Sequence, residues 1–411
     1  MQEQDTYYLN EICTQNALYT QQTGRKKKCL THTFGCQMNE RDSEILFGFL
    51  AQMGYEKTDI EAEADLVLFN TCCIREKAES KVLSHLGELK KLKQKNPDMI
   101  IGVCGCMMQQ KGMADMIRSS APYVDLIFGT HNLHHFPKYL YDVYQGKGRQ
   151  IEVLDKEEGV QEGLPSYREY PFKALVNIVY GCNNFCTYCI VPYVRGRERS
   201  RKQADIVQEV KQLVADGVVE VTLLGQNVNS YGLDLQDGTT FAGLLQELDQ
   251  IEGLRRIRYM TSHPKDLTEE LVKTIAESSK VVDHFHLPVQ SGSSRVLDLM
   301  NRRYTKEHYL HLIDMIRKYM PDAAISTDII VGFPGETEED FLETIDLVQK
   351  VKFDSAFTFV YSKRTGTPAA RMEDPVSLEE KKERLQRLND ALSDISRDIN
   401  DKLQDTVVEV L

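Results

Sequence analysis

The sequence lacks several features that would place it in a specialised class of protein. Its longest apolar runs, at residues 65–70 and 99–103, fall far short of the roughly 18 residues that a membrane-spanning helix needs. The first 28 residues are polar and contain no apolar core of a secretory signal. With 12 Pro and 25 Gly, neither a fibrous repeat nor wholesale disorder fits. We therefore expect a globular, cytoplasmic protein with no membrane partner.

Basic charge is not in excess either. The 50 Lys and Arg residues stand against 62 Asp and Glu, a net charge of -12, which argues against indiscriminate binding to nucleic acid, and no DNA partner is expected. One local run, residues 194–202, nevertheless carries five cations and one acidic residue. Such a run is either a solvated surface or a nucleic-acid contact. Its cations are Arg195, Arg197, Arg199, Arg201 and Lys202.

Ten cysteines are present, although a reducing compartment excludes structural disulfides. Metal or redox chemistry is therefore the leading interpretation. Three of the cysteines form one C-x3-C-x2-C run, namely Cys182, Cys186 and Cys189. The others are dispersed as Cys13, Cys29, Cys36, Cys72, Cys73, Cys104 and Cys106.

Two regions alternate apolar strands with helices. Residues 29–145 contain near-continuous apolar strands, which predicts an α/β domain with a doubly wound parallel sheet. Residues 146–170 are polar and read as a linker. Residues 171–376 show six strands and five intervening helices, fewer than the eight strands of a closed barrel. They predict an open (β/α)6 barrel.

The two ends of the chain complete this organisation. Residues 1–28 form a polar extension to which no element is assigned. Ser377 and Glu380 form a capping box before a periodic apolar run, so residues 377–404 predict a long amphipathic helix that packs on the barrel. Residues 405–411 are expected to be the first strand of a small domain that is missing.

The first three strands of the N-terminal domain each end in cysteine. These cysteines are Cys36, the Cys72–Cys73 pair, and Cys104 with Cys106. Because ligands of open parallel sheets bind beyond the carboxyl ends of the strands, three thiolates can meet there without being close in sequence.

The cysteine triplet follows the first strand of the barrel, and no fourth Cys or His is near it. If three thiolates hold a four-iron cluster, the fourth iron can bind the amino and carboxylate groups of S-adenosylmethionine (SAM). Reductive cleavage of SAM then yields a 5′-deoxyadenosyl radical. A catalytic zinc site is the alternative.

The triplet, with Tyr188 before its last cysteine, resembles the motif of the radical SAM superfamily. That resemblance places Tyr188 near the adenine of SAM, although plain packing is an alternative. Residues 33–43, 70–78 and 102–112, taken together with the triplet, resemble the methylthiotransferases, and among them the tRNA 2-methylthio-N6-dimethylallyladenosine synthases. This resemblance covers about residues 29–411. Relatives acting on threonylcarbamoyladenosine or on a ribosomal protein aspartate remain an alternative.

The resemblance implies two 4Fe-4S clusters. The radical cluster falls on Cys182, Cys186 and Cys189, and an auxiliary cluster falls on Cys36, Cys72 and Cys106. Cys73 is expected to be a bystander, because adjacent residues cannot both point into one site. Cys104 is expected near the auxiliary site, because residues i and i+2 of a strand share a face. Cys13 and Cys29 are interpreted as structural or incidental.

The implied activity converts isopentenyl-modified adenosine beside the anticodon of tRNA to its 2-methylthio form. Carbon 2 of adenine bears a strong C–H bond that no ordinary side-chain base can activate. Two SAM molecules are therefore expected, one as methyl donor and one as radical source, with a low-potential electron donor. The resemblance implies that a small C-terminal β-domain helps such relatives to hold tRNA, and residues 405–411 are expected to be the start of that domain.

Further contacts are expected at the strand ends of the barrel. Polar residues there either bind SAM or act as helix caps, and Arg195, Arg197, Arg199 and Arg201 are the candidates for substrate contact. The SAM candidates, beside Tyr188, are Gln226, Asn227, Asn229, Gln290, Ser291, Asp328 and Gly332. Two other classes of function remain open, an iron-sulfur electron carrier and a redox-sensing RNA-binding protein. Neither of them needs SAM.

Overall fold

The computed structural model describes residues 3–73 and 76–407. It divides the chain into two compact units. The first runs to Cys182 and includes 190–209 and 215–218, and the second contains 183–189, 210–214 and the chain from Val219 onward. Within the described ranges, no helix is long and apolar enough to cross a membrane.

A six-stranded sheet is the centre of the first unit. Its strands follow the order β2-β1-β3-β4-β5-β6, and every neighbouring pair is parallel. This confirms the predicted α/β class. The strands are β1 (Lys28–Thr33), β2 (Glu56–Lys57), β3 (Leu66–Thr71), β4 (Ile100–Gly105), β5 (Leu126–Phe128) and β6 (Gln150–Glu152).

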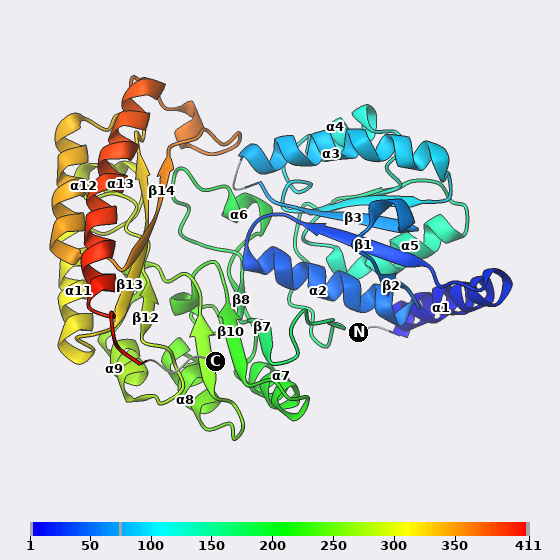
Figure 1. The fold of residues 1–411 in the computed structure, drawn as a ribbon, viewed down its shortest axis with the longest axis horizontal. Helices are drawn as coiled ribbons and strands as arrows, with labels where there is room; N and C mark the ends of the chain where they lie inside the picture. Colours follow the sequence, from blue (N-terminus) through cyan, green and yellow to red (C-terminus); the bar gives the residue numbers. More distant parts are fainter. Residues whose placement is uncertain (1–2, 74–75, 408–411) are drawn as a thin grey trace. The chain divides into compact units, whose positions relative to one another are not determined.

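Helices cover both faces of this sheet, because successive strand residues point to opposite sides. Leu66 and Leu68 of β3 pack in a cluster with α1, α2 and α5, whereas Val67 and Phe69 pack in a second cluster with α3 and α4. Figure 1 shows α2 and α3 on opposite sides of the strands. The helices are α1 (Glu3–Thr23), α2 (Gln37–Gln52), α3 (Glu76–Lys95), α4 (Met113–Ser120) and α5 (Phe136–Tyr144), with short 3-10 turns η1 (Glu61–Glu63) and η2 (Leu133–His135).

Several elements occur where the sequence predicted none, and α1 and β6 are two of them. Helix α1 occupies the polar extension, where the few apolar residues share one face: Leu9 and Ile12 are buried, and Asn16 Nδ2 donates to Met53 O at 2.8 Å. Strand β6 lies inside the predicted linker and pairs with β5. Its three residues are half-buried or exposed, so it carries no apolar pattern that would reveal a strand.

Short elements complete the first unit. Strands β8 and β9 pair antiparallel, and they flank the loop that carries the cysteine triplet. These elements are β7 (Lys173–Asn177), β8 (Val179–Tyr180), α6 (Val191–Val194) and β9 (Arg199–Ser200). Helix α7 (Gln203–Ala215) follows them.

The second unit continues the alternation with parallel strands. β10 (Glu220–Leu224) pairs with β11 (Arg256–Tyr259), and β12 (His284–His286), β13 (Ala324–Val331) and β14 (Ser355–Val360) form a second sheet in that order. A single bridge joins Ile257 to Val281. Strands therefore occur at each position predicted for this region, again in the α/β class. The helices are α8 (Phe241–Asp249), α9 (Glu269–Glu277), α10 (Ser294–Leu299), α11 (Lys306–Tyr319) and α12 (Glu338–Val351), with turns η3 (Val228–Ser230), η4 (Pro264–Asp266) and η5 (Ala369–Arg371).

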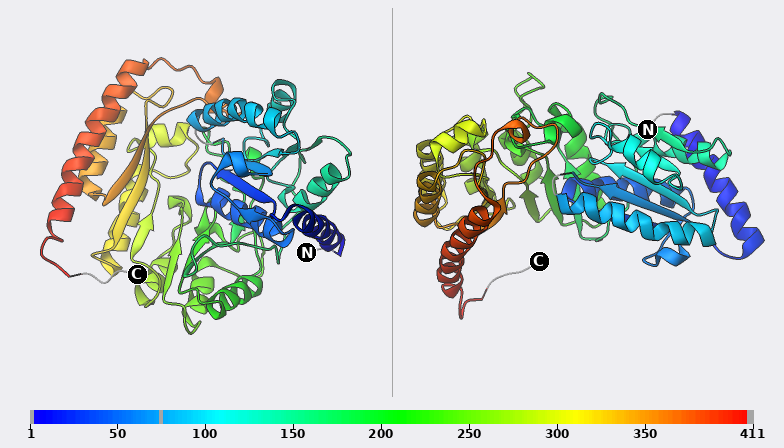
Figure 2. Two further views of the ribbon diagram at one scale, coloured as in Figure 1. Left: turned by 45° about the vertical axis from the view of Figure 1, so that its right-hand side comes forward. Right: turned by 90° about the horizontal axis from the view of Figure 1, so that it is seen from above.

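The last helix, α13 (Leu378–Asp401), packs on β14 and α12, and Figure 2 shows it beside these elements. Ser377 Oγ accepts the N–H of Glu380, as the capping box predicts. The buried Arg384 donates to Glu336 Oε1 at 2.8 Å, which fixes the helix to the loop after β13. The strand expected at 405–411 falls partly on residues 408–411, which lie outside the described residues, and 405–407 contain no strand.

Candidate functional site

Three cysteines follow the carboxyl ends of β1, β3 and β4. Cys36 is the N-cap of α2, and its Sγ lies 4.0 Å from Asn39 Oδ1. Cys106 Sγ lies 3.7 Å from the same oxygen. Cys72 packs against Gly35, where a Cβ atom would stand 2.5 Å from Cys72 Cβ. The structure therefore brings these cysteines into one locality of the first unit.

Asn39 was missed by the sequence analysis, although it belongs to the GCQMN segment. It is fully buried. Its Nδ2 donates to Phe34 O at 2.8 Å and to Thr71 O at 3.0 Å. The side chain thus joins the loop after β1 to the end of β3, and it holds the backbone segments next to Cys36 and Cys72 close to each other.

Cys104 does not share a face with Cys106. The alternation of β4 ends at Gly105, whose φ is 93° and whose added Cβ would lie 2.5 Å from Thr71 O. Cys104 packs in the cluster with α2, and Cys106 packs in the cluster on the other face. Burial raises the pKa of the Cys104 thiol well above its usual value, as expected of a core cysteine.

Arg195 lies at the candidate ligand Cys106. Its Nε donates to Cys106 Sγ at 3.2 Å, and its Nη2 donates to Asn39 Oδ1 at 2.6 Å and Asp42 Oδ2 at 2.8 Å. The side chain is buried, and Asp42 compensates its charge. Arg195 was predicted to contact substrate, but in the structure its guanidinium is hydrogen-bonded to Cys106, Asn39 and Asp42.

Cys73 is a close neighbour of the same thiol. A hydrogen bond from Cys73, together with the charge of Arg195, lowers the pKa of Cys106 to about 7 against the effect of burial. The same hydrogen bond, with burial, raises the pKa of Cys73 well above its usual value. These effects therefore favour ionisation of Cys106 over ionisation of Cys73.

The triplet begins at a turn that only glycine can form. Gly181 has a φ of 71°, and a Cβ there would stand 2.1 Å from Arg197 O. Cys182 N–H donates to Gly196 O at 3.1 Å. Cys182 belongs to the first unit, whereas Cys186 and Cys189 belong to the second.

Cys186 has its own buried arginine. Arg302 Nη1 donates to Cys186 Sγ and to the Tyr188 hydroxyl, both at 3.3 Å. Its Nη2 donates to Pro288 O at 2.7 Å, which anchors the guanidinium. Arg302 was missed by the sequence analysis, because no local pattern connects it with a cysteine more than a hundred residues earlier. Burial raises the pKa of Tyr188 well above its usual value.

Two of the predicted SAM contacts after β10, Asn227 and Asn229, form hydrogen bonds with the loop after β11. Asn227 Oδ1 and Asn229 Oδ1 accept the N–H of His263 at 3.0 and 3.1 Å. Gln226 lies half-buried beside them. Burial and the nearby Arg302 lower the pKa of His263, so its imidazole is neutral. Among the described residues, the buried His263 Nε2 and Ser262 Oγ have no hydrogen-bond partner.

The remaining predicted SAM contacts lie after β12, on β13 and directly after β13. Gln290 has a φ of 72° and its N–H donates to Asp328 O at 2.8 Å. Ser291 is fully buried and its Oγ accepts the N–H of Ser293. Asp328 Oδ1 lies 3.7 Å from His286 Nε2. Gly332 packs against α13, where a Cβ would stand 2.2 Å from Lys381 Cγ. Ser291 and Gly332 therefore have local structural roles.

The other arginines of the basic run differ in exposure. Arg201 is buried and pairs with Glu162 and Glu209, the latter at 2.6 Å. Arg199 pairs with Glu157 at 3.0 Å. Arg197 is exposed. Of the predicted substrate contacts, Arg197 is thus the most exposed, Arg199 is partly exposed, and Arg195 and Arg201 are buried.

Comparison with known proteins gives two family matches and a set of solved structures. Residues 176–348 match the radical SAM superfamily, and residues 28–129 match the uncharacterized protein family UPF0004. The radical SAM methyltransferase TsrM from Kitasatospora setae, solved with cobalamin and a [4Fe-4S] cluster, has a TM-score of 0.60 at 14% identity and covers 84% of this chain and 76% of its own. The cobalamin-dependent radical enzyme OxsB has a TM-score of 0.55 at 12% identity, with 90% and 56% covered. These likenesses show the fold.

Curated relatives are much more similar in sequence. The tRNA-2-methylthio-N(6)-dimethylallyladenosine synthase of Acetivibrio thermocellus is 55% identical over 98% of this chain and 84% of its own length. The enzyme of the same name from Clostridioides difficile is 53% identical over 100% and 86%, and that of Clostridium beijerinckii is 57% identical over 93% and 85%. The chain therefore belongs to the family of tRNA-2-methylthio-N(6)-dimethylallyladenosine synthases, within the radical SAM superfamily.

Proposed function

We propose that this protein converts isopentenyl-modified adenosine beside the anticodon of tRNA to its 2-methylthio form. It is a radical SAM tRNA methylthiotransferase that uses SAM and two 4Fe-4S clusters, in agreement with relatives of 53 to 57% identity. The observation that carries the proposal is the convergence of Cys36 and Cys106 on Asn39, with Cys72 packed against Gly35. An enzyme that only generates a radical has no need of this second set of thiols.

The donor sets fit these cofactors. Thiolates are the usual protein ligands of iron-sulfur clusters, and we assign Cys36, Cys72 and Cys106 to the auxiliary cluster. Cys182, Cys186 and Cys189 are assigned to the radical cluster. The partnerless Ser262 Oγ and His263 Nε2 are buried polar atoms that a bound SAM or substrate would satisfy. When bound, the clusters supply electron transfer to SAM and a carrier for the transferred sulfur.

The chain's own residues hold these groups in place. Arg195 and Cys73 donate to Cys106, and Arg302 donates to Cys186 while orienting the Tyr188 hydroxyl. Each guanidinium is buried, so its hydrogen bond to sulfur is not weakened by water. We regard both arginines as positioning residues for the reaction.

The RNA contact is assigned to exposed cations. Arg197 and Lys202 point to solvent and are suited to phosphates, which position a nucleic acid without reading its sequence. The modified base leaves its stack to react, which is inexpensive for a single-stranded loop. A low-potential electron donor and a cytoplasmic location follow from the need to reduce SAM and to meet tRNA.

The proposal is tested with anaerobically reconstituted protein, SAM, a reductant and anticodon-loop RNA. Mass spectrometry of the nucleosides is expected to show the 2-methylthio product only when the RNA carries the isopentenyl group. Product from RNA without that group, or from threonylcarbamoyladenosine, would move the protein to a sister branch. Failure to form 5′-deoxyadenosine would instead favour an electron carrier or a redox sensor.

A further inference from the structure

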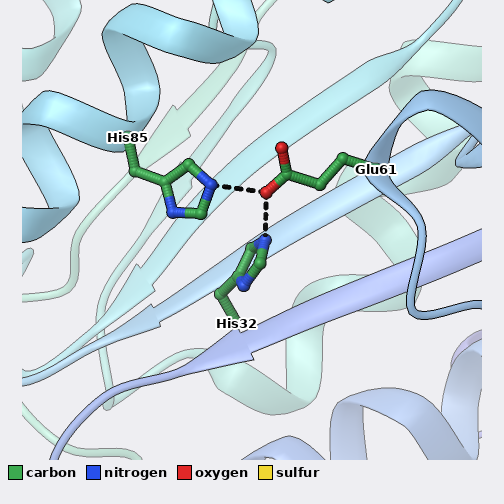
Figure 3. Close-up of side chains that lie close together, drawn as sticks. All are labelled: His32, Glu61 and His85. Carbon is green, nitrogen blue, oxygen red and sulfur yellow. Dashed lines mark hydrogen bonds and ion pairs between the residues drawn. The ribbon is translucent and has the colours of Figure 1, made fainter.

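A second group of metal-ligand side chains lies in the first unit, apart from the ten cysteines. His32 is on β1, Glu61 is on η1 and His85 is on α3. Their ligand atoms all lie within 4.8 Å of one another. Figure 3 shows both imidazole Nε2 atoms directed at the same carboxylate oxygen. We propose that His32, Glu61 and His85 bind a divalent metal ion of the zinc class.

The donor set has the chemistry of such a site. Two neutral imidazoles and one carboxylate are a recurrent set of protein ligands for Zn²⁺, with a fourth position left for water. The three side chains are each about a quarter exposed, from 24 to 27%. The group is therefore screened from bulk water and still open to an ion and a water ligand.

The spacing needs only a small adjustment. His32 Nε2 lies 2.7 Å from Glu61 Oε1, whereas ligand atoms around tetrahedral zinc stand about 3.3 Å apart, given bonds of about 2.0–2.1 Å. Glu61 lies in a 3-10 turn and has three rotatable side-chain bonds, so its carboxylate can withdraw by less than 1 Å. The two imidazoles are already side by side, with ring centroids 4.5 Å apart.

Aromatic packing fixes the direction of both imidazoles. Phe69 is the register partner of His32 on β3, and its ring centroid lies 5.0 Å from His32 and 5.2 Å from His85. Because Phe69 is fully buried, the imidazole rings of His32 and His85 pack against a side chain that has little freedom to move. A preformed direction of the ligand atoms lowers the entropic cost of binding an ion.

The three ligands come from separate elements, so the ion would connect them. It would tie α3 and η1 to β1 on the face of the sheet that carries Phe69. Cys36 comes four residues after His32, and Cys72 comes four residues before α3 begins at Glu76. The proposed ion would thus stabilise the two segments that flank the candidate auxiliary ligands.

The test measures Zn²⁺ binding by the reconstituted holoprotein, in which iron already occupies the cysteines. After equilibrium dialysis against micromolar Zn²⁺, elemental analysis is expected to find one zinc per chain with unchanged iron. His85→Ala and Glu61→Ala should each lose this zinc and keep their iron. His135→Ala is the matched control, because His134, His135 and Glu158 are a second group of ligand atoms within 4.8 Å of one another. This variant should keep the zinc, and its loss would place the ion at that group and overturn the proposal.

Zinc X-ray absorption of the wild-type protein decides the question independently of how the variants fold. Nitrogen and oxygen ligands without sulfur are expected. Sulfur in the first shell would show that zinc occupies the cysteines, and this would overturn the proposal. So would the absence of bound zinc, or zinc that persists in both His85→Ala and Glu61→Ala.

Discussion

At the scale of single residues, each candidate cluster site has one buried arginine on one ligand sulfur. Arg195 donates to Cys106, and Arg302 donates to Cys186. Hydrogen bonds and positive charge near cluster sulfurs stabilise the reduced state of a cluster. If these thiols hold the clusters, we expect the two arginines to affect the reduction potentials of the clusters as well as the positions of the thiols.

Removing the guanidinium of Arg195, with its hydrogen bond to Cys106 Sγ, is expected to lower the reduction potential of the auxiliary cluster by tens of millivolts. The variant is Arg195→Gln combined with Asp42→Asn, because Arg195→Gln alone leaves a buried carboxylate unpaired, at a cost of about 3–5 kcal/mol. The measurement is a redox titration followed by electron paramagnetic resonance. Arg197→Gln, at an exposed position, is the control. An unchanged potential in the double variant would exclude this role.

Adjacent cysteines are expected to differ in their effect on iron content. Cys72→Ser should reduce iron from about eight to about four atoms per chain, because we assign Cys72 as a ligand. Cys73→Ser should keep about eight, because we do not assign Cys73 as a ligand and a hydroxyl can donate to Cys106 as the thiol does. Iron analysis after anaerobic reconstitution gives the answer. The opposite pattern would make Cys73 the ligand.

Sequence spacing identified the cysteines as candidate cluster ligands, but it did not identify the residues that form hydrogen bonds with their thiols. Cys182, Cys186 and Cys189 are readable because the motif is local. Asn39 and Arg195 are 156 positions apart, and a single sequence contains no information about such a pair. Arg195 was therefore interpreted as a substrate contact, from its place in the basic run, whereas the structure buries it against Cys106.

At the scale of elements, glycine turns place the sulfurs. Gly35 and Gly105 both have positive φ values, of 115° and 93°, and each lies next to a candidate ligand. A strand residue in the left-handed region ends the alternation of side chains. This is why Cys104 and Cys106, two positions apart, pack on different faces of the sheet.

Gly35→Ala is expected to abolish the auxiliary cluster and to keep the radical cluster. The new Cβ would stand 2.5 Å from Cys72 Cβ, in addition to the backbone strain at φ 115°, which costs about 1–3 kcal/mol. Gly112→Ala is the control, because it has φ 80° but a Cβ there meets no atom of the described chain within 4 Å. Iron content and electron paramagnetic resonance separate the two outcomes. Two clusters in Gly35→Ala would contradict this argument.

Most elements were predictable, because apolar strands and amphipathic helices carry clear periodic patterns. The exceptions are instructive. α1 buries Leu9 and Ile12 within an otherwise polar stretch, and β6 is a short edge strand stabilised by hydrogen bonds to β5. Backbone pairing at a sheet edge leaves no signature in side-chain hydrophobicity, so the segment looked like a linker.

At the scale of the whole molecule, the two cysteine sets belong to separate parts of the sequence and have separate supports. Arg195, Asn39 and Asp42 surround the auxiliary set within the first unit. Arg302 and Tyr188 accompany Cys186 within the second. Each set can therefore be removed while the local support of the other is kept.

The triple variant Cys182→Ala, Cys186→Ala, Cys189→Ala is expected to keep about four iron atoms per chain and to form no 5′-deoxyadenosine. The remaining iron should be lost on further replacement of Cys106 by Ala. Iron analysis and chromatography of the nucleoside products measure both effects. Complete loss of iron in the triple variant would show that the two sites are not independent.

The anchoring of Asn39 has a consequence for assembly of the holoprotein. Its amide donates to a carbonyl group in the loop after β1 and to another at the end of β3, so protein hydrogen bonds alone hold these two segments together. We therefore expect that an apoprotein whose clusters have been destroyed by oxygen takes up new clusters without refolding.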